Sequence, residues 1–115
     1  MNNKPIIIVS GEPNSVFLEI FFKSLKSNRY RSPLIIICCK KLMEKQMKKL
    51  GFFFKINTIN KTFSKFNKLD NKQINLINID YKFDNCFEKI SSKSNNYIKK
   101  SFDVALEIIH QNKLT

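Results

Sequence analysis

The sequence contains little glycine, cysteine, histidine, tryptophan or arginine. Its 115 residues include two Gly, three Cys, one His and no Trp, and only two of its 21 basic residues are Arg. Two glycines exclude a collagen-like chain, three cysteines exclude a disulfide-stapled scaffold, and one histidine excludes a histidine cluster for a metal. A chain of this length fits one small domain and excludes two full enzyme domains.

Long hydrophobic runs are also missing. No run approaches the roughly 20 apolar residues that span a bilayer, and the apolar stretch at residues 6–9 is too short for a secretory signal. The chain is nevertheless 43% apolar and rich in Ile and Phe, which argues against disorder throughout. We therefore expect a cytoplasmic protein that does not associate with membranes.

The net charge of +12 has a compositional explanation. Lys, Asn, Ile and Phe account for 60 of the 115 residues, and all four have codons rich in A and T, so an AT-rich genome would produce this composition without selection for a partner. A basic surface attracts phosphate backbones. Nucleic-acid-binding proteins, however, also use Arg for bidentate contacts, and this chain has only Arg29 and Arg31. The composition favours a solvated Lys-rich surface over a nucleic-acid site.

Four short runs rich in Ile, Leu or Phe predict β-strands. Continuous apolar runs of this length, bounded by polar residues, are typical of strands that are buried on both faces. They lie at residues 6–9, 34–39, 52–56 and 74–80.

The first predicted helix covers residues 15–26. Val16 and Ile20 recur at helical spacing and are expected to face the core, with Phe17, Phe21 and Leu25 following less regularly. Asn14 or Ser15 can cap the first turn, because each side chain accepts a hydrogen bond from an orphan backbone N–H.

Two more amphipathic segments predict helices at residues 40–50 and 91–111. Gly51 fits the C-cap of the first, because a left-handed conformation carries no Cβ penalty there, and Ser91 or Ser92 caps the second. Lys41, Lys45, Lys48 and Lys49 are expected to face solvent. The expected inward residues are Leu42, Met43, Met47 and Leu50 in one helix, and Ile98, Phe102, Ala105 and Ile109 in the other.

The order of these elements predicts the fold class. Residues 57–73 form a long loop with one helical turn, anchored by Phe63, Phe66 and Leu69, and residues 81–90 are irregular. Alternation of buried strands with amphipathic helices predicts an α/β fold in three layers, with a largely parallel sheet and flanking helices. We expect residues 1–115 to form one unit without an internal boundary.

Cysteine and histidine give no sign of catalysis. Cys38 and Cys39 are adjacent in a predicted strand and therefore point to opposite faces, and Cys86 is distant in sequence. We interpret them as small buried residues in a reducing compartment. His110 is expected to be a surface residue near a helix end, where a cation is favourable.

One local motif, Gly11-Glu12-Pro13-Asn14-Ser15, lies between the first strand and the first helix. Ligands of open α/β sheets bind outside the carboxyl ends of the strands, and the following helix offers N–H groups to an anion. An ordinary βα turn uses the same residues: Gly for backbone freedom, Pro for a fixed φ and Asn or Ser for the cap. Neither glycine-rich phosphate-loop fingerprint is present.

Residues 4–20 resemble the amino terminus of the 4-hydroxythreonine-4-phosphate dehydrogenases of pyridoxal phosphate biosynthesis. That family opens with an apolar strand, the motif Gly-(Asp/Glu)-Pro-Ala-Gly-Ile-Gly-Pro-Glu and a helix. Residues 33–51 resemble the family's second βα unit, and the segment with Ser91, Ser94 and Tyr97 resembles the helix before its catalytic region. Gly11, Glu12, Pro13 and Glu19 match the motif, Val16 stands for its Ile, and Asn14, Ser15, Phe17 and Leu18 stand for its Ala, Gly, Gly and Pro.

The resemblance implies an isocitrate/isopropylmalate dehydrogenase-like fold, of which this chain is an incomplete amino-terminal portion. It implies NAD-dependent oxidation and decarboxylation of 4-hydroxythreonine 4-phosphate, a small phosphorylated amino acid, by a homodimer that binds a divalent metal cation. The family's metal-binding histidines lie beyond the matched region, and His110 matches none of them. The resemblance therefore assigns no catalytic or metal residue here, and we expect no turnover from this chain alone. It implies that Gly11, Glu12, Pro13 and Asn14 lie at the edge of the cofactor and substrate cleft.

Two alternatives remain open at the level of the sequence. A small Lys-rich protein that binds RNA or an acidic partner would explain the charge, and its affinity would fall steeply with salt. A standalone remnant that kept the fold and lost the chemistry would explain the departures from the family motif.

Overall fold

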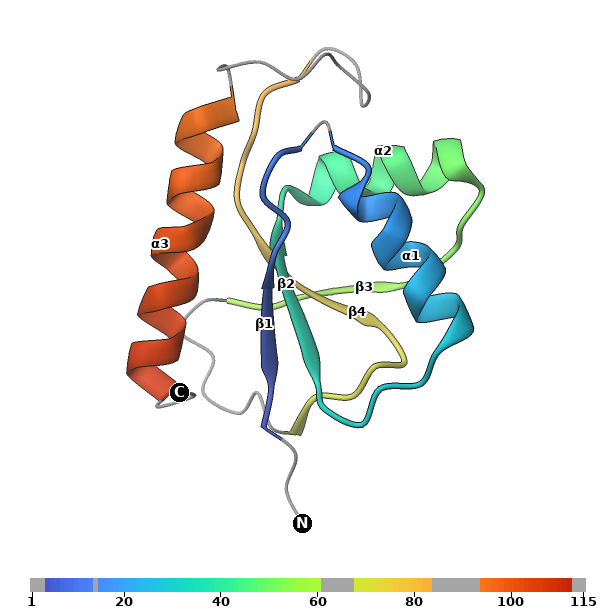
Figure 1. Cartoon of the computed structure of the whole chain (residues 1–115), viewed down its shortest axis with the longest axis horizontal. Coiled ribbons are helices and arrows are strands. Elements are labelled where there is room, and N and C mark those ends of the chain that lie inside the picture. Colours follow the sequence, from blue (N-terminus) through green and yellow to red (C-terminus); the bar gives the residue numbers. More distant parts are fainter. Residues whose placement is uncertain (1–3, 14, 61–67, 84–93, 113–115) are drawn as a thin grey trace.

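Four parallel strands form one sheet in the computed structural model, which describes residues 4–13, 15–60, 68–83 and 94–112 (Figure 1). The strand order is β1-β2-β4-β3, and each neighbouring pair is parallel. The predicted α/β class and parallel sheet are therefore confirmed. In chain order the elements are β1 (Ile6–Val9), α1 (Phe17–Ser27), β2 (Leu34–Cys38), α2 (Lys40–Leu50), β3 (Ile56–Thr58), β4 (Ile74–Asn78) and α3 (Asn95–Asn112).

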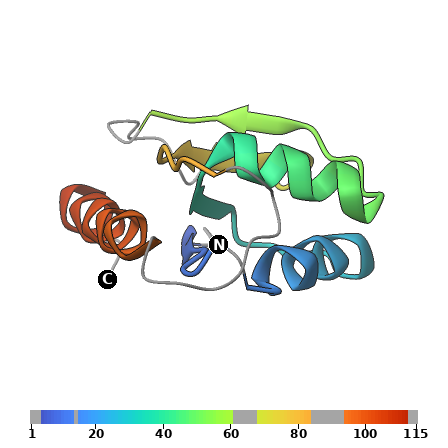
Figure 2. The ribbon, with the colours of Figure 1, turned by 90° about the horizontal axis from the view of Figure 1, so that it is seen from above.

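The helices cover the two faces of the sheet unequally. Figure 2, which looks from above, shows α3 on one side of the strands and α1 and α2 together on the other. Two hydrophobic clusters correspond to these faces: α1 and α2 pack with Ile36, Cys38 and Leu76, and α3 packs with Ile35 and Ile37. The predicted three-layer arrangement is thus confirmed.

Strand β2 lies between β1 and β4, and all five of its residues are buried. Its side chains alternate between the two clusters, since successive residues of a strand point to opposite faces. This alternation also separates Cys38 from Cys39, which join different clusters as predicted.

Two asparagine side chains join the strands near their amino ends. Asn71 accepts a hydrogen bond from the Leu34 backbone N–H (2.9 Å) and donates to the carbonyl of Ser32 (2.9 Å). Asn75, which is buried, donates to the Leu34 carbonyl (3.3 Å) and accepts from the side chain of Asn57 on β3 (3.1 Å). These amides tie β2, β3 and β4 together in one alignment.

Helix α2 agrees with the sequence-based expectation. Leu42, Met43 and Met47 are buried, and its outward lysines are exposed. The helix ends at Gly51, which has φ 78° and ψ 24°, the left-handed conformation that favours glycine at a C-cap.

The expected inward face of α1 is wrong in part. Phe21 is buried as predicted, and Phe17 and Leu25 pack against the core. Val16 and Ile20 are exposed, whereas Leu18, Phe21 and Phe22 are buried. Burying the two large aromatic rings removes more apolar surface from water than burying the two smaller aliphatic side chains would. The helix is therefore rotated so that its phenylalanines face the sheet.

The expected inward stripe of α3 is also wrong in part. Ala105 is buried as predicted, but Phe102 is 52% exposed, and Ile98 and Ile109 are only half-buried. The buried face instead consists of Ser94, Tyr97, Ser101, Val104, Ala105 and Ile108. Its polar members form hydrogen bonds, as when Ser101 Oγ donates to the Tyr97 carbonyl (2.8 Å), so their burial carries no unsatisfied group.

The predicted strand at residues 52–56 is wrong except at its last residue. Phe52 to Lys55 lie outside any strand, and β3 begins at Ile56 and continues to Thr58, inside the predicted long loop. Phe52 and Phe54 pack their rings against Phe22 (centroids 5.5 and 6.1 Å apart). Residues 52–54 are therefore positioned by ring packing, and the chain enters the sheet only after them, at Ile56.

Other expectations have mixed outcomes. Leu69 packs against the core, and Tyr81 to Phe83 are irregular, as predicted. Asn14, Phe63, Phe66, Cys86, Ser91 and Ser92 lie outside the described residues. Within those residues, no helix combines the length and apolar character needed to cross a membrane.

Candidate functional site

The segment that follows β1 lies at the carboxyl edge of the sheet, as the motif predicted. It contains Ser10, Gly11, Glu12 and Pro13, and it leads into α1 at the top of Figure 1. Gly11 has φ 71°, and a Cβ built on it would meet no atom within 4 Å. Backbone conformation, not crowding, is therefore what requires glycine at this position.

Helices α2 and α3 hold this loop through side chains. Ser94, in the turn before α3, donates its hydroxyl to Glu12 Oε2 (2.7 Å). Gln46 of α2 is fully buried and donates its Nε2 to the Pro13 carbonyl (3.1 Å). Glu12 and Pro13 are thus fixed from both faces of the sheet.

Ser15 closes the loop onto α1. Its hydroxyl donates to the Glu12 carbonyl (2.8 Å) and accepts from the Phe17 backbone N–H (3.2 Å), which belongs to the first helical residue. The expected capping role of Ser15 is confirmed in this form, although the N-cap position itself is Val16.

Behind the loop lies a buried network centred on Tyr97 of α3. The Tyr97 hydroxyl accepts from the backbone N–H of Cys39 (2.8 Å) and is hydrogen-bonded to the hydroxyl of Ser10 (3.3 Å). Ser10 follows β1, and Cys39 follows β2. One tyrosine therefore joins the carboxyl ends of two neighbouring strands.

The Cys38 thiol belongs to the same network. Burial raises the pKa of Cys38 from its usual value near 9 to about 11, against the opposing effect of hydrogen bonds with Tyr97 and Ser10. Burial also raises the pKa of Tyr97 above its usual range, and the neighbouring Cys38 adds to that rise. Both groups are neutral near pH 7, so Cys38 lacks the thiolate character of a nucleophile.

The site does not fit a metal ion. Within the described part of the chain, no three His, Cys, Asp or Glu side chains come together as ligands would. His110 is exposed in the last turn of α3. It lies about 20 Å along the helix from Tyr97 at 1.5 Å per residue, which separates it from the loop and from both described cysteines.

The structure thus brings together Gly11, Glu12 and Pro13 at one edge, while Asn14 lies outside the described residues. Sequence reasoning missed the contribution of Ser10 and Gln46. For Gln46 a signal existed, because it occupies an inward position of α2 between Met43 and Met47. A polar residue on an otherwise apolar face indicates a buried hydrogen bond.

Comparison with known proteins gives a clear likeness to a solved structure. No family model and no curated protein matches the sequence. A solved structure of a 4-hydroxythreonine-4-phosphate dehydrogenase from Burkholderia phymatum matches with a TM-score of 0.77 and 19% sequence identity. The match covers 97% of this chain and 34% of that chain, so this chain spans about a third of the relative's length.

This likeness confirms the resemblance at the level of the fold. The segment of the dehydrogenase that matches extends over nearly all of this chain. The predicted α/β architecture is therefore the architecture of one part of a larger known structure.

Proposed function

We propose that the chain is the amino-terminal part of an oxidoreductase that converts 4-hydroxythreonine 4-phosphate by NAD-dependent oxidation and decarboxylation. Residues 1–115 would form one portion of an α/β domain in that enzyme. The observation that carries this proposal is the structural match to such a dehydrogenase over 97% of the chain. The short sequence motif at Gly11, Glu12 and Pro13 supports it independently.

The loop after β1 is the part of this chain that would face the substrate. Ligands of parallel sheets bind outside the carboxyl ends of the strands, and a preorganised loop loses little entropy when it binds. The Glu12 carboxylate accepts hydrogen bonds, as its contact with Ser94 shows. It therefore suits a hydroxyl or ammonium group of the substrate, and we propose a positioning role for it.

The described residues do not fit the cofactors of this reaction. They contain no metal-ligand cluster. The loop has a single glycine, followed by a carboxylate and by a proline that lacks an N–H, so it makes a poor cradle for a dinucleotide pyrophosphate. NAD and the divalent cation would be bound by the part of the enzyme that this chain does not match.

Exposed apolar side chains are consistent with a larger assembly. Val16 and Ile20 are exposed on α1, and Phe102 and Leu106 on α3. We propose that these faces pack against the remainder of the dehydrogenase or a second subunit of a homodimer, since exposed apolar patches commonly mark interfaces.

A chimera tests the proposal. This chain would replace the matched third of the Burkholderia phymatum dehydrogenase, and NADH formation from 4-hydroxythreonine 4-phosphate would be followed by absorbance. We expect turnover from the chimera and none from the isolated chain. In the chimera, Glu12→Gln should raise KM, while Lys72→Gln, exposed just before β4 at the amino-terminal edge of the sheet, should leave it unchanged.

The outcome also separates the alternatives. A chimera that melts cooperatively and binds NAD but gives no turnover would contradict the proposal and support a remnant that kept only the fold. If the chimera shows no cooperative melting transition, the points at which the two proteins are joined would be moved to other loop positions, and activity would be measured again.

A further inference from the structure

The segment between α2 and β3 presents one aromatic ring to solvent. Phe53 is 89% exposed, while the rings of its neighbours Phe52 and Phe54 pack on Phe22 in the core. The Phe52 N–H donates to the Met47 carbonyl (3.0 Å), and the Phe54 N–H to Met47 Sδ (3.4 Å). Because both neighbours are fixed, Phe53 is held outward by the backbone.

Phe53 forms one wall of an open hollow of about 300 Å³. The charged residues that line it are Lys40, Lys48 and Glu44. Its apolar lining comes from Met47, Phe52, Phe53, Phe54 and Ile56. The hollow thus combines a flat exposed ring with cationic side chains.

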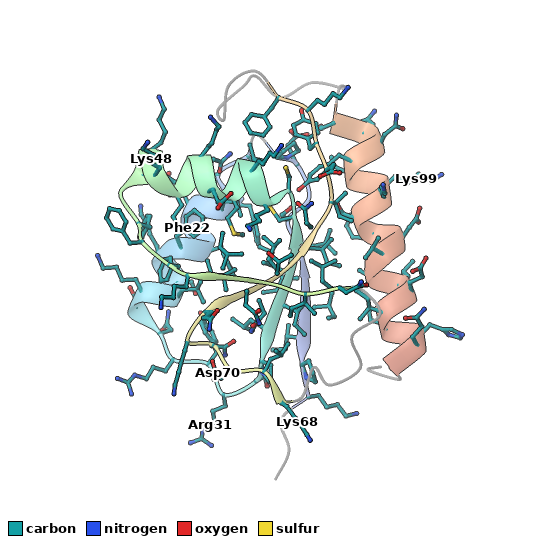
Figure 3. The ribbon with its side chains drawn as sticks, turned by 180° about the vertical axis from the view of Figure 1, so that it is seen from behind. Phe22, Arg31, Lys48, Lys68, Asp70 and Lys99 are labelled. Atoms are coloured by element: carbon teal, nitrogen blue, oxygen red, sulfur yellow. The ribbon has the colours of Figure 1, made fainter. Side chains whose placement is uncertain are left out.

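The surface around the hollow is basic. Helix α2 carries five lysines and one glutamate, and Lys55 is exposed two residues after Phe53. Lys26 of α1 places its Nζ 5.9 Å from the centre of the Phe52 ring, on the same segment. In Figure 3, Lys48 lies at the α2 side of the molecule and Lys99 at the α3 side.

We propose that this surface binds single-stranded nucleic acid, with a base stacked on Phe53 and backbone phosphates held by the lysines. Such binding needs a positive surface that follows the backbone and an aromatic side chain for the bases, and it does not require Arg for base readout. The inference stands independently of the proposed dehydrogenase function, because it uses no residue of the loop after β1.

A membrane surface fits less well. An interfacial helix inserts an apolar face. In α2, however, Leu42, Met43 and Met47 are buried, and the half-buried Leu50 packs against the same core. One exposed phenylalanine is a small anchor for a bilayer, whereas it is sufficient for one stacked base.

The test uses the full chain and a fluorescently labelled oligouridylate, with binding measured by anisotropy. Loss of one stacked base by alanine substitution lowers affinity by roughly tenfold or more. We therefore expect Phe53→Ala to weaken binding about tenfold. The matched control is Phe102→Ala, which also removes an exposed ring but from the opposite side of the sheet, and it should change affinity less than twofold.

Charge is tested with a second matched pair. Lys48→Gln should reduce the slope of log affinity against log salt by about 0.7, the value for one phosphate contact with a single strand. Lys99→Gln, which removes the same charge on the far side, should leave the slope unchanged. Far-ultraviolet circular dichroism and thermal melting would show that all four variants remain folded.

Several outcomes would overturn the inference. These are absence of binding at low salt, equal losses from Phe53→Ala and Phe102→Ala, and equal affinity for a duplex of the same length. Binding to anionic phosphatidylserine vesicles that depends on Phe53, without binding to the oligouridylate, would assign the surface to membranes instead.

Discussion

The loop after β1 and the segment between α2 and β3 are both short connections, yet different interactions hold them in place. The first is fixed by hydrogen bonds from Ser94 and Gln46. The second has no side-chain hydrogen bond from another helix among those described; two phenylalanine rings pack on Phe22, and two backbone N–H groups bond to Met47. Hydrogen bonds orient polar groups at defined atoms, whereas ring packing only requires that apolar surface be buried. The first arrangement suits the proposed substrate-positioning loop. The second suits the proposed nucleic-acid surface, where a base stacks on Phe53 whatever its identity.

Removing the aromatic anchor should have the largest effect on stability. Phe22 has no exposed surface and supports both Phe52 and Phe54. We expect Phe22→Ala to lower the free energy of unfolding by about 3–5 kcal/mol, through lost burial and the cavity that remains. Urea denaturation measures this, with Phe53→Ala as the control, because an exposed ring should change stability by less than about 0.5 kcal/mol. Equal effects would show that Phe53 is not held apart from the core.

Alkaline pH should lower the free energy of unfolding through the buried network of Cys38 and Tyr97. The pKa of Cys38 is about 11 when folded and near 9 in its usual environment, so the unfolded chain releases this proton first. Stability from this group is complete below pH 9 and falls as pH rises from 9 to 11, by about 3 kcal/mol in all. Tyr97, whose pKa is also raised, acts in the same direction.

Urea denaturation at stepped pH values checks this expectation. Cys38→Ala should flatten the decline between pH 9 and 11, since the variant has no thiol to titrate there. An identical pH dependence in the two proteins would show that the thiol of Cys38 does not contribute.

Deleting one hydroxyl from the polar network should have a moderate effect. Tyr97→Phe keeps the ring but leaves the backbone N–H of Cys39 without its partner. A buried donor left unsatisfied costs about 1–3 kcal/mol, and we expect a decrease of about 1–2 kcal/mol by thermal or urea unfolding. In hydrogen exchange, the Cys39 amide should lose more protection than amides of α2. Uniform loss across the chain would mean that the hydroxyl has no local role.

The smallest effect is expected where the loop meets solvent. Glu12 is half-buried, and Glu12→Gln keeps an acceptor for the Ser94 hydroxyl while removing the charge. We expect stability to fall by about 0.5–1 kcal/mol, because a charge-assisted bond becomes a neutral one. Ser94→Ala on its own and combined with Glu12→Gln would complete a double-mutant cycle, and additivity in that cycle would show that the two side chains do not interact.

Much of the fold follows from local sequence, and the errors have a common cause. The runs around Ile7, Ile36 and Leu76 are strands because continuous apolar residues suit a doubly covered sheet. The apolar pattern predicted the wrong buried face of α3, because it placed Phe102 inward, whereas Tyr97 is buried and Phe102 is exposed. Tyr97 is buried where its hydroxyl has partners just after β1 and β2, and no periodicity reveals those partners.

The sequence predicted where the loop after β1 lies, but not which side chains hold it. Gly11 and Pro13 mark a βα turn, and a general rule for parallel sheets places that turn at the ligand-binding edge. The side chains that fix it, Gln46 and Ser94, are 33 residues from Pro13 and 82 residues from Glu12 in sequence. Contacts of such separation depend on tertiary packing, which a single sequence does not display.

The buried amide of Asn75 fixes the register between strands of very similar sequence. Isoleucine runs such as Ile6–Val9 and Leu34–Cys38 could slide past a neighbour by two residues and still present similar side chains to the same face. Such a slide would separate Asn75 from the Leu34 carbonyl and from Asn57, leaving polar groups buried without partners. One buried amide among apolar side chains therefore makes the observed register more favourable than registers shifted by two residues.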